Sequence, residues 1–416
     1  MQITLTAPAK LDIKISLPAS KSISNRILII YSLSGGSMLP QNLSDCDDTN
    51  VIIDAMRYMP DVIDIKAAGT AMRFMTAYLS VMRGTHTITG TERMKHRPIG
   101  VLVEALRKLG ADIEYVESEG YPPLRITGRR LTGGVVDIPG NVSSQYISAL
   151  LMIGPVLDRG LELRLTGDII SRPYIDLTLW LMREFGADAE WISGDSISVK
   201  PQPYKNREYI IENDWSGASY WYEMVALSKD RDATVQLAGL ADGSKQGDSV
   251  VKYIFSLLGV KTIFETKEES QLQMVTLKKS GRCLPRLEYD FVNSPDLAQT
   301  VVVTCCMLGV KFHFRGLATL KIKETDRITA LKTEMRKLGF VLTDRNDSEL
   351  IWDGTRCEPA SGSSIDTYND HRMALAFAPV SMQQAVRINN PEVVTKSYPC
   401  FWDDLRHAGF IIDETK

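Results

Sequence analysis

Apolar residues recur three and four positions apart in several stretches of the chain, and each stretch is followed by a glycine and a short alternating run. The five stretches that share this pattern are residues 101–116, 179–192, 251–264, 328–342 and 400–412. The spacing predicts helices with one apolar face. The glycine is expected just after each helix, where it adopts a positive φ at little cost. Residues 51–65 are a weaker copy, with Pro60 in place of the glycine.

The turning residues are spaced regularly enough to indicate a repeat. They stand at positions 60, 110, 186, 259, 339 and 409. This spacing predicts six units of about 70 residues, each with a helix that leads into a strand. Alternating residues in 130–140 and 161–169 predict two further strands. Helix–glycine–strand is common in α/β proteins, but five good copies favour a repeat, and the expected fold class is α/β.

Length and charge narrow the classes of function. The chain has 416 residues, which predicts two or three domains. Its 48 lysines and arginines nearly balance its 51 aspartates and glutamates, so the net charge is −3. This balance excludes a strongly basic nucleic-acid-binding protein. No apolar run approaches the length of a membrane span, and we expect no secretory leader at the start of the sequence.

The cysteines and histidines do not indicate a metal centre. The six cysteines form no C-x-x-C pair, and the five histidines are scattered without the spacing of a zinc site. Cys305 and Cys306 lie within an apolar run and are expected in a core. We therefore expect no metal and a reducing, cytoplasmic compartment.

Polar and basic residues gather just before several apolar helices. Ser20 or Ser22 is expected to cap a helix that begins near Ile23, with Lys21 and Arg26 in its first turns. A helix start offers free N–H groups and a positive dipole end, so added cations create an anion site. Taken alone, this motif is explained more simply by a capped surface helix with solvated charges.

Seven further motifs carry the same kinds of side chain. Their principal residues are Gly69 with Thr70 as a cap and Arg73; Arg97 before Pro98; Ser143, Ser144 and Gln145; Arg172 and Tyr174 around Pro173; Asp296 with Lys323, Glu324 and Arg327; Arg372; and Lys396. Each alone has a plain structural explanation, such as a cap, a turn or an exposed charged helix. Together they predict a site for a small substrate with several anionic groups. Asp296 and Glu324 are the candidate acid–base groups, with Lys21 and Lys396 assisting.

Eight motifs taken together resemble those of the 5-enolpyruvylshikimate-3-phosphate (EPSP) synthase family. They are SKSISNR, AGTAMR, RMKHRPI, VSSQY, SRPYID, PDLAQT, KETDR and YNDHRMA, in the order of the family. The resemblance implies a two-lobed enolpyruvyl transferase fold with three βαβαββ units in each lobe, similar to an inverse α/β barrel, and an active site in the cleft between the lobes. It places the N-terminal lobe at residues 20–212 and the C-terminal lobe at residues 1–19 plus 213–416. It also implies a monomer without a cofactor.

The resemblance implies one reaction. The enolpyruvyl group of phosphoenolpyruvate is transferred to the 5-hydroxyl of shikimate 3-phosphate, and phosphate leaves a tetrahedral intermediate, in the shikimate pathway to chorismate and the aromatic amino acids. The residues then expected to bind shikimate 3-phosphate are Lys21, Ser22, Arg26, Ser143, Ser144, Gln145, Ser171, Tyr174, Asp296 and Lys323. Those expected around phosphoenolpyruvate are Lys21, Gly69, Arg97, Arg327, Arg372 and Lys396. Asp296 is expected to act as the base for the hydroxyl, and Glu324 as the acid and later the base at C3.

Four positions depart from the usual family pattern. Ala19 replaces a glycine, Ala67 an asparagine, Phe74 a proline, and Thr319 a substrate-binding asparagine. Threonine has a shorter reach and fewer donors than asparagine. Gly69 keeps the form that is sensitive to glyphosate, so we expect inhibition that is competitive with phosphoenolpyruvate.

Two other functions are compatible with parts of the sequence. The first is the sister enolpyruvyl transferase that acts on UDP-N-acetylglucosamine. That family usually has a cysteine or aspartate on a mobile loop, whereas the matching stretch here, residues 90–100, has no cysteine. The second is a two-lobed protein that captures an anionic metabolite without turnover, against which Asp296 and Glu324 argue.

Overall fold

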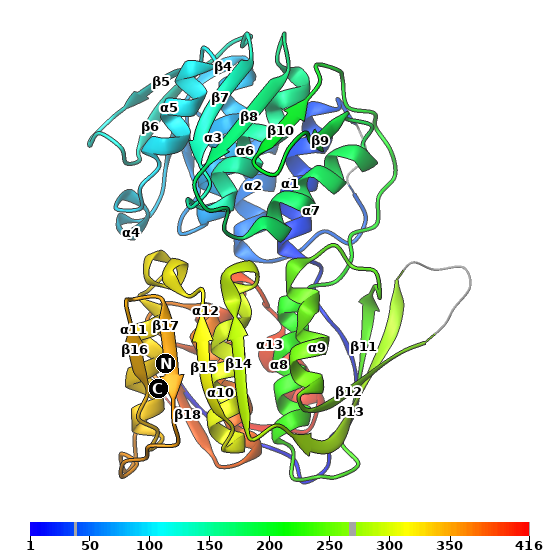
Figure 1. Ribbon diagram of the computed structural model, residues 1–416, viewed down its shortest axis with the longest axis vertical. Helices are drawn as coiled ribbons and strands as arrows, with labels where there is room; N and C mark the ends of the chain where they lie inside the picture. Colours follow the sequence, from blue (N-terminus) through cyan, green and yellow to red (C-terminus); the bar gives the residue numbers. More distant parts are fainter. Residues whose placement is uncertain (37–39, 266–271, 416) are drawn as a thin grey trace. The chain divides into compact units, whose positions relative to one another are not determined.

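The chain divides into two compact units (Figure 1). The structure is a computed structural model that describes residues 1–36, 40–265 and 272–415. Unit 1 comprises residues 1–18 and 212–416, and unit 2 comprises residues 19–211. The chain therefore leaves unit 1 after Pro18 and returns to it at Glu212, one residue before each of the expected boundaries.

A βαβαββ topology recurs in both units. In each complete copy the first two strands are parallel and the last two are antiparallel, so the strand order is first, second, fourth, third. One copy in unit 2 comprises β3 (Val62–Asp64), α3 (Gly69–Val81), β4 (Gly84–Thr89), α5 (Gly100–Lys108), β5 (Asp112–Tyr115) and β6 (Leu124–Gly128), with the short α4 (Glu92–Lys95) before α5. The other comprises β7 (Gly134–Pro139), α6 (Ser144–Ile153), β8 (Leu161–Thr166), α7 (Arg172–Glu184), β9 (Ala189–Trp191) and β10 (Ser196–Val199).

Unit 1 contains two complete copies, and one of them is assembled from distant parts of the chain. It comprises β2 (Asp12–Ser16), α8 (Trp215–Leu227), β11 (Thr234–Leu240), α9 (Val251–Ser256), β12 (Leu258–Phe264) and β13 (Gln273–Cys283). The other comprises β14 (Arg286–Asp290), α10 (Ala298–Leu308), β15 (Lys311–Arg315), α11 (Arg327–Lys337), β16 (Thr343–Arg345) and β17 (Glu349–Trp352). Strands β2 and β11 pair in parallel within one sheet. In the sequence, however, all of unit 2 lies between them.

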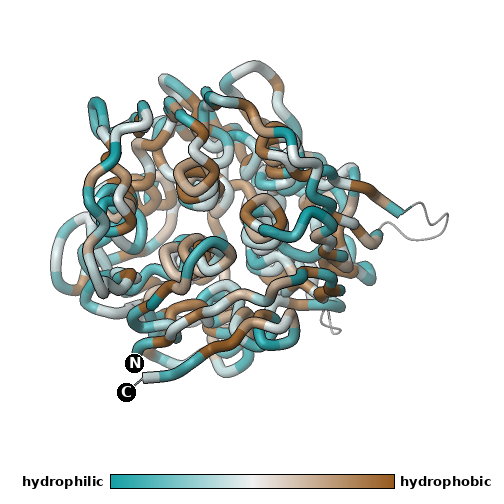
Figure 2. Tube along the Cα trace, turned by 90° about the horizontal axis from the view of Figure 1, so that it is seen from below, coloured by the Kyte–Doolittle hydropathy of each residue, from teal (hydrophilic) through white to brown (hydrophobic). Residues whose placement is uncertain are grey.

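Two further copies are reduced. The third copy of unit 1 comprises α12 (His371–Phe377), β18 (Val386–Asn389), α13 (Phe401–His407), β19 (Ile411–Thr415) and β1 (Gln2–Thr6), and its first strand is reduced to a bridge between Ile365 and Ile388. Because β1 lies between β18 and β19, the two ends of the chain lie side by side (Figure 2). The third copy of unit 2 comprises α1 (Lys21–Leu33) and α2 (Asp47–Tyr58), with a bridge between Gln41 and Ile210.

The expected glycine turns are confirmed. Each of the five glycines has a positive φ, from 80° at Gly186 to 103° at Gly110. Gly259 differs in position, since it lies inside β12 rather than directly after the helix. In the weaker copy the left-handed residue is Met59, with φ 40°, and Pro60 follows it. Proline cannot adopt a positive φ, so the turn is made one residue earlier.

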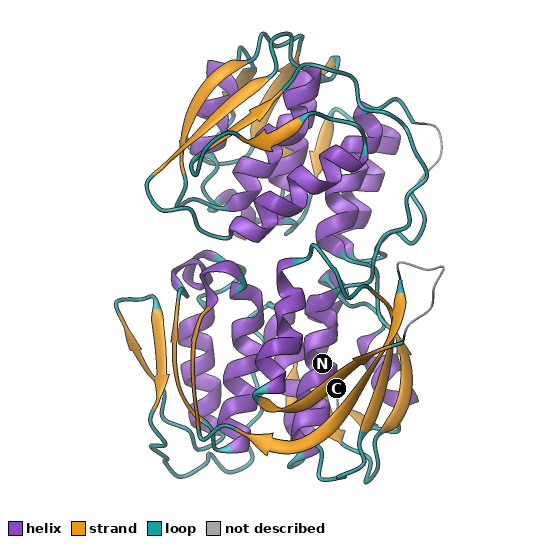
Figure 3. Cartoon of the chain, turned by 45° about the vertical axis from the view of Figure 1, so that its right-hand side comes forward, coloured by secondary structure: helices purple, strands orange, loops and turns teal. Residues whose placement is uncertain are grey.

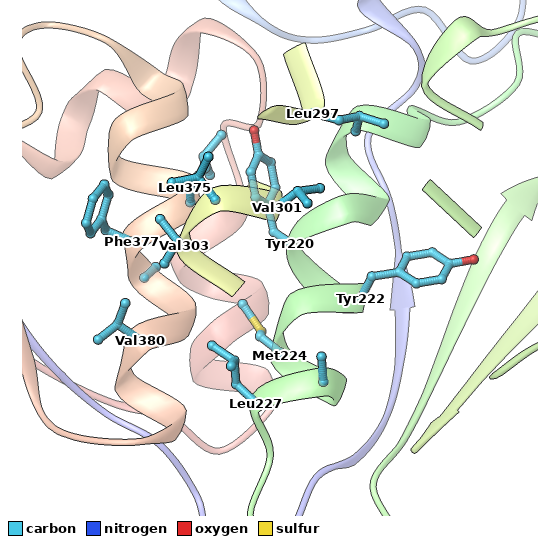
Figure 4. Packing of buried hydrophobic residues seen from close by; sticks show 14 of the residues in the cluster. Tyr220, Tyr222, Met224, Leu227, Leu297, Val301, Val303, Leu375, Phe377 and Val380 are labelled. Carbon is cyan, nitrogen blue, oxygen red and sulfur yellow. The ribbon is translucent and has the colours of Figure 1, made fainter. Parts of the chain in front are cut away.

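Three helices form the centre of unit 1. Every residue of α8 and α12 is buried, as are the first nine residues of α10. Figure 4 shows Tyr220, Val301 and Leu375 from these three helices in one cluster. Helices that are apolar on all sides belong in an interior. The sheets lie outside them (Figure 3), so the starts of the inner helices are positioned by a rigid core.

The cysteines and the helix lengths agree with parts of the sequence analysis. Cys305 and Cys306 are fully buried in α10, as expected, and all six cysteines are free. Within the described ranges, no helix combines the length and the apolar composition that crossing a bilayer would require.

The core of unit 1 contains one carboxyl group that lacks a partner. Glu223 of α8 is fully buried, and neither of its oxygens makes a hydrogen bond to a described residue. Burial raises the pKa of Glu223 well above its ordinary value. The folded protein therefore holds a proton that the unfolded chain loses above a pH of about 4.3.

Glu223→Met is expected to stabilise the protein more at pH 8 than at pH 5. The free energy of unfolding is highest below the pKa of Glu223 in the unfolded chain, and it falls as the pH rises toward the pKa of Glu223 in the folded protein. Methionine does not titrate, so Glu223→Met removes this fall, and we expect it to raise the free energy of unfolding by about 1–3 kcal/mol at pH 8. Urea unfolding at both pH values measures it, with the exposed Glu358→Met as control. An equal pH dependence in wild type and Glu223→Met would contradict the prediction.

Candidate active site

Arg327 lies at the centre of a group of charges in unit 1. We name this group the carboxylate–arginine cluster, and it consists of Asp296, Lys323, Glu324, Arg327, Asp370, Arg372 and Lys396. Arg327 is the first residue of α11 and is only 1% exposed. Its Nε donates to Asp370 Oδ2 at 2.7 Å, its Nη1 to Asp296 Oδ1 at 3.0 Å, and its Nη2 to Glu324 Oε2 at 2.9 Å. A buried charge is tolerated when it is paired and hydrogen-bonded in this way.

Asp296 joins Arg327 to two more cations. It lies in the short 3-10 turn Pro295–Leu297 that leads into α10. Arg372 Nη2 donates to Asp296 Oδ2 at 3.0 Å, and Lys323 Nζ lies 3.6 Å from Asp296 Oδ1. Burial by itself would raise the pKa of Asp296, but Arg372, Lys323 and Arg327 hold it well below its usual range. Asp296 is therefore ionised throughout the physiological pH range.

Glu324 and Asp370 complete the cluster. Lys396, at the end of the 3-10 segment Pro391–Lys396, donates from Nζ to Glu324 Oε1 at 2.9 Å. Asp370 is fully buried and caps α12, because its Oδ1 accepts from Arg372 N at 3.0 Å. Although burial lowers the pKa of Arg327, Asp370, Glu324 and Asp296 raise it above the ordinary value. The six residues predicted in this region are thus brought together, with Asp370 as an additional member.

Eight of the predicted residues of unit 2 lie at or near the starts of α1, α6 and α7. We name them the helix-start cluster, and they are Lys21, Ser22, Arg26, Ser143, Ser144, Gln145, Ser171 and Tyr174. Ser20 caps α1 by accepting from Ile23 N at 3.4 Å, so the helix begins at Lys21 rather than near Ile23. Ser143 caps α6 by accepting from Gln145 N at 3.3 Å. Ser171 precedes α7 with a φ of 54°.

Arg26 connects the helices of this cluster. Its Nε donates to Thr178 Oγ1 of α7 at 2.7 Å, and its Nη2 lies 3.3 Å from Ser148 Oγ of α6 and from the Tyr174 carbonyl. The guanidinium also lies over the Phe74 ring, 5.4 Å from its centroid. Burial lowers the pKa of Arg26 to about 10, so it remains a cation at neutral pH. The side chain is thus anchored in the fold before any ligand arrives.

Lys21 and Gln145 have partners on other helices. Lys21 Nζ forms an ion pair of 3.1 Å with Asp48 of α2, and Gln145 Nε2 donates to Thr70 Oγ1 of α3 at 3.0 Å. These bonds place the first turns of α1 and α6 against α2 and α3.

Gly69 and Arg97 are in close contact within unit 2. Gly69 is the first residue of α3, and a Cβ built on it would lie 2.6 Å from Arg97 Nη1. One expectation about this region is wrong. Thr70 does not cap α3, since Ala68 holds the cap position and Thr70 accepts from Gln145. Pro98 lies before α5, which begins at Gly100, and its carbonyl accepts from Arg73 Nη2 at 3.1 Å.

Four supporting residues were not singled out as site residues from the sequence. They are Asp48, Ser148, Thr178 and Asp370. Asp370 had a usable signal, since an aspartate directly before an apolar helix is a typical cap. The others had none, because Ser148 and Thr178 meet Arg26 only through the packing of helices that are 122 and 152 residues away from it in the sequence.

Other candidate ligand groups are few. Among the described residues, no group of three or more His, Cys, Asp or Glu side chains is suited to a metal ion. Thr319 Oγ1 is shielded from solvent and makes no hydrogen bond to a described residue.

Fold and clusters together define a class of protein. Two α/β units carry lysines and arginines at the starts of their helices, and carboxylates lie among those cations. Cations at helix starts bind anions, and ionised carboxylates beside them can move protons. Such a protein is an enzyme that acts on small substrates with several anionic groups.

Known proteins identify the family within this class. The family model described as EPSP synthase (3-phosphoshikimate 1-carboxyvinyltransferase) matches residues 57–405. A 3-phosphoshikimate 1-carboxyvinyltransferase of Bacteroides fragilis is 60% identical over 411 residues, which cover 99% of this chain and 98% of the relative. One from Colwellia psychrerythraea is 35% identical and is covered over 99% of its length, with 98% of this chain. The solved EPSP synthase of Acinetobacter baumannii has a TM-score of 0.79 at 21% identity, over 99% of this chain and 100% of that one.

The chain belongs to the EPSP synthase family. Its activity is that of a 3-phosphoshikimate 1-carboxyvinyltransferase, a transferase of the shikimate pathway in aromatic amino acid biosynthesis. The expected resemblance and fold class are thereby confirmed. The alternatives of a UDP-N-acetylglucosamine transferase and of a binding protein without turnover are set aside.

Proposed function

We propose that this enzyme transfers the enolpyruvyl group of phosphoenolpyruvate to the 5-hydroxyl of shikimate 3-phosphate and releases phosphate. The observation that carries the proposal is the carboxylate–arginine cluster. In it, two carboxylates suited to proton transfer, Asp296 and Glu324, lie within hydrogen-bond distance of the cations expected to bind phosphoenolpyruvate.

Shikimate 3-phosphate is assigned chiefly to unit 2. Lys21, Ser22, Arg26, Ser143, Ser144, Gln145, Ser171 and Tyr174 bind its phosphate, ring and hydroxyls. Supporting this role, several of these residues lie at or near the starts of helices, where N–H groups and the helix dipole favour a phosphate. Asp296, Lys323 and Thr319 are assigned to the reacting end of the same substrate.

Six residues are assigned to phosphoenolpyruvate. Arg327, Arg372 and Lys396 belong to unit 1, whereas Gly69, Arg97 and Lys21, which is also assigned to shikimate 3-phosphate, belong to unit 2. In the free protein the three cations of unit 1 are paired with Asp296 and Glu324. The carboxylate and phosphate of the incoming substrate compete for these cations.

This competition gives a mechanism for activating the base. While Asp296 is held by Arg372, Lys323 and Arg327, its lowered pKa makes it a weak proton acceptor. When phosphoenolpyruvate takes over these cations, the pKa of Asp296 rises toward its ordinary range. Asp296 then accepts the proton of the 5-hydroxyl as the hydroxyl oxygen attacks C2. Glu324, which takes up a proton once Arg327 and Lys396 bind the substrate instead, gives that proton to C3.

The second half of the reaction reverses one of these proton transfers. Loss of a C3 proton to Glu324 re-forms the double bond while phosphate leaves the tetrahedral centre and takes up the proton that Asp296 had accepted, so both carboxyl groups return to their starting states. The lysines and arginines stabilise the departing phosphate. Lys396 is placed to assist, because its ammonium already contacts Glu324 at 2.9 Å. Lys21 is the second assisting cation.

The experiment is a paired assay of phosphate release without added metal. One reaction contains shikimate 3-phosphate and phosphoenolpyruvate, and the other contains UDP-N-acetylglucosamine and phosphoenolpyruvate. We expect phosphate and the enolpyruvyl product in the first only. Phosphate in the second only, or in neither, would overturn the proposal.

Gly69→Ala is expected to weaken phosphoenolpyruvate binding with little effect on folding. The new methyl group would displace the Arg97 guanidinium, which is the mobile end of a long side chain and can move without the backbone. We expect KM for phosphoenolpyruvate to rise about tenfold and KM for shikimate 3-phosphate to stay within about twofold. Steady-state kinetics measure both, with Gly243→Ala, where a methyl group meets open space, as control. Unchanged kinetics would remove Gly69 from the site.

The same position bears on inhibition. We propose that glyphosate inhibits the wild-type enzyme competitively with phosphoenolpyruvate and that Gly69→Ala weakens this inhibition. The ring of Phe74, one of the four departures from the family pattern, lies under the guanidinium of Arg26. Absence of inhibition of the wild type at millimolar glyphosate would contradict the proposal.

We also propose that the enzyme works as a monomer in the cytoplasm. Six free cysteines are compatible with a reducing compartment. Analytical ultracentrifugation at assay concentrations tests the first part, and fractionation of cells tests the second.

A further inference from the structure

A left-handed turn precedes the arginine-bearing start of α12. Tyr368 has a φ of 53° and Asn369 a φ of 56°. Left-handed conformations are unfavourable for residues with a side chain, and an aromatic residue is less tolerant of them than asparagine. Two such residues in succession persist only when surrounding contacts hold them.

The contacts that hold this turn come from a fully buried carboxylate outside the carboxylate–arginine cluster. Glu334 of α11 is 0% exposed. Its Oε1 accepts from the Tyr368 hydroxyl at 2.6 Å, and its Oε2 accepts from Asp366 N at 3.1 Å. Lys337 Nζ lies 2.8 Å from Glu334 Oε2 and 2.7 Å from Asp366 Oδ2, so its ammonium bridges the two carboxylates.

Helix α11 therefore holds the segment 366–370 at two points. Glu334 binds it before and within the turn, and Arg327 binds Asp370 directly after it with two hydrogen bonds of 2.7 and 3.1 Å. Arg327 and Glu334 are seven residues apart, so they lie on the same face of the helix two turns from each other.

The turn sets the position of both arginines. Asp370 orients Arg327 through its side chain, and it starts the helix that carries Arg372. A shift in the backbone at residues 368 and 369 would move Asp370 and, with it, the two guanidinium groups.

We propose that Glu334 and Tyr368 are positioning residues, which hold the left-handed turn at residues 368 and 369 and thereby place Arg327 and Arg372 for phosphoenolpyruvate. The inference rests on the proposed function for the identity of that ligand. Neither residue belongs to the set assigned to the substrates, and both act through Asp370.

Tyr368→Phe tests the hydroxyl that holds the turn. We expect KM for phosphoenolpyruvate to rise about tenfold while KM for shikimate 3-phosphate stays within about twofold, because the affected arginines serve only the first substrate. The matched control is Tyr222→Phe, which removes another tyrosine hydroxyl bond in unit 1, to Thr262 at 2.9 Å, far from this turn in the sequence. The control is expected to leave both KM values unchanged.

Asn369 provides a test that removes no described contact. This residue is exposed, and glycine lowers the cost of a positive φ whereas alanine raises it. Asn369→Ala is expected to raise KM for phosphoenolpyruvate, and Asn369→Gly combined with Tyr368→Phe is expected to recover about threefold of the lost affinity. Opposite effects of alanine and glycine at residue 369 on KM for phosphoenolpyruvate would show that the left-handed backbone conformation itself controls the affinity.

Amide hydrogen exchange separates this inference from the proposed function. In Tyr368→Phe, the amides of Asp370 and Arg372 are expected to exchange faster than in wild type, and this readout does not require turnover. If Tyr368→Phe and Asn369→Ala leave KM for phosphoenolpyruvate within about twofold and exchange unchanged, the positioning role is overturned. If the wild type forms no product but exchange changes as expected, the proposed function fails and the turn mechanism stands. Should Tyr368→Phe not fold, Asn369→Ala alone gives the decision through KM and exchange, because it leaves the Tyr368 hydroxyl in place.

Discussion

Asp296→Asn is expected to reduce kcat by about a thousandfold without raising KM for phosphoenolpyruvate. Asparagine has nearly the shape of aspartate but cannot accept the proton of the 5-hydroxyl. It also releases part of the positive charge of Arg372, Lys323 and Arg327, which Asp296 neutralises in the free enzyme. Those cations then bind the anionic substrate at least as well as before.

The combination of a lost kcat with retained binding distinguishes a base from a merely structural partner. Steady-state rates give kcat, and calorimetry with shikimate 3-phosphate present gives the affinity for phosphoenolpyruvate. Asp353→Asn, an exposed aspartate in the same unit, is the matched control and should behave as wild type. Turnover within about tenfold of wild type in Asp296→Asn would show that another group takes the proton.

Arg327→Met is expected to cause the largest loss of stability and to abolish measurable turnover. Removing one partner from a buried ion pair costs about 3–5 kcal/mol, because the other charge is left buried without compensation. Arg327 bonds three carboxylates, and Asp370 among them is fully buried. The loss should shrink at low pH, where the carboxylates can take up protons instead.

Urea unfolding at pH 7 and pH 4.5 measures this effect. Arg406→Met is the control, since Arg406 also bonds two carboxylates, Asp403 and Glu414, but is 44% exposed. Exposed pairs contribute at most about 1 kcal/mol, so this change should be nearly neutral. Equal losses for Arg327→Met and Arg406→Met would mean that the cluster does not depend on Arg327.

The sequence contained the repeat and most of the helix starts. Gly110, Gly186, Gly339 and Gly409 were recognisable because a helix that ends in a positive φ has a strong preference for glycine. Met59 was not recognisable, since the weaker copy makes its turn with a residue that rarely adopts this conformation. A turn can thus be predicted from the sequence where its backbone conformation strongly favours one residue type, such as glycine.

The identity of the site residues was also predictable, but their connections were not. Motifs indicated Arg26, Asp296 and Arg327, whereas nothing indicated that Arg26 is already bonded to Thr178 or that Asp296 holds three cations in the free protein. These bonds join residues far apart in the sequence, and they depend on how whole helices pack. The lowered pKa of Asp296 follows from that packing and could not be read from a local pattern.

The discontinuity of unit 1 has a consequence for the order of synthesis. A ribosome completes residues 19–211 as one uninterrupted stretch, so unit 2 can fold while the rest of the chain is still being made. The strands β1 and β2 leave the exit tunnel first. The partner of β2, β11, is synthesised only after all of unit 2, and the partners of β1, β18 and β19, are synthesised last. Strand β2 must therefore remain unpaired until unit 2 has been made, and β1 must remain unpaired until translation is almost finished. They are the natural binding segment for a chaperone that acts on nascent chains.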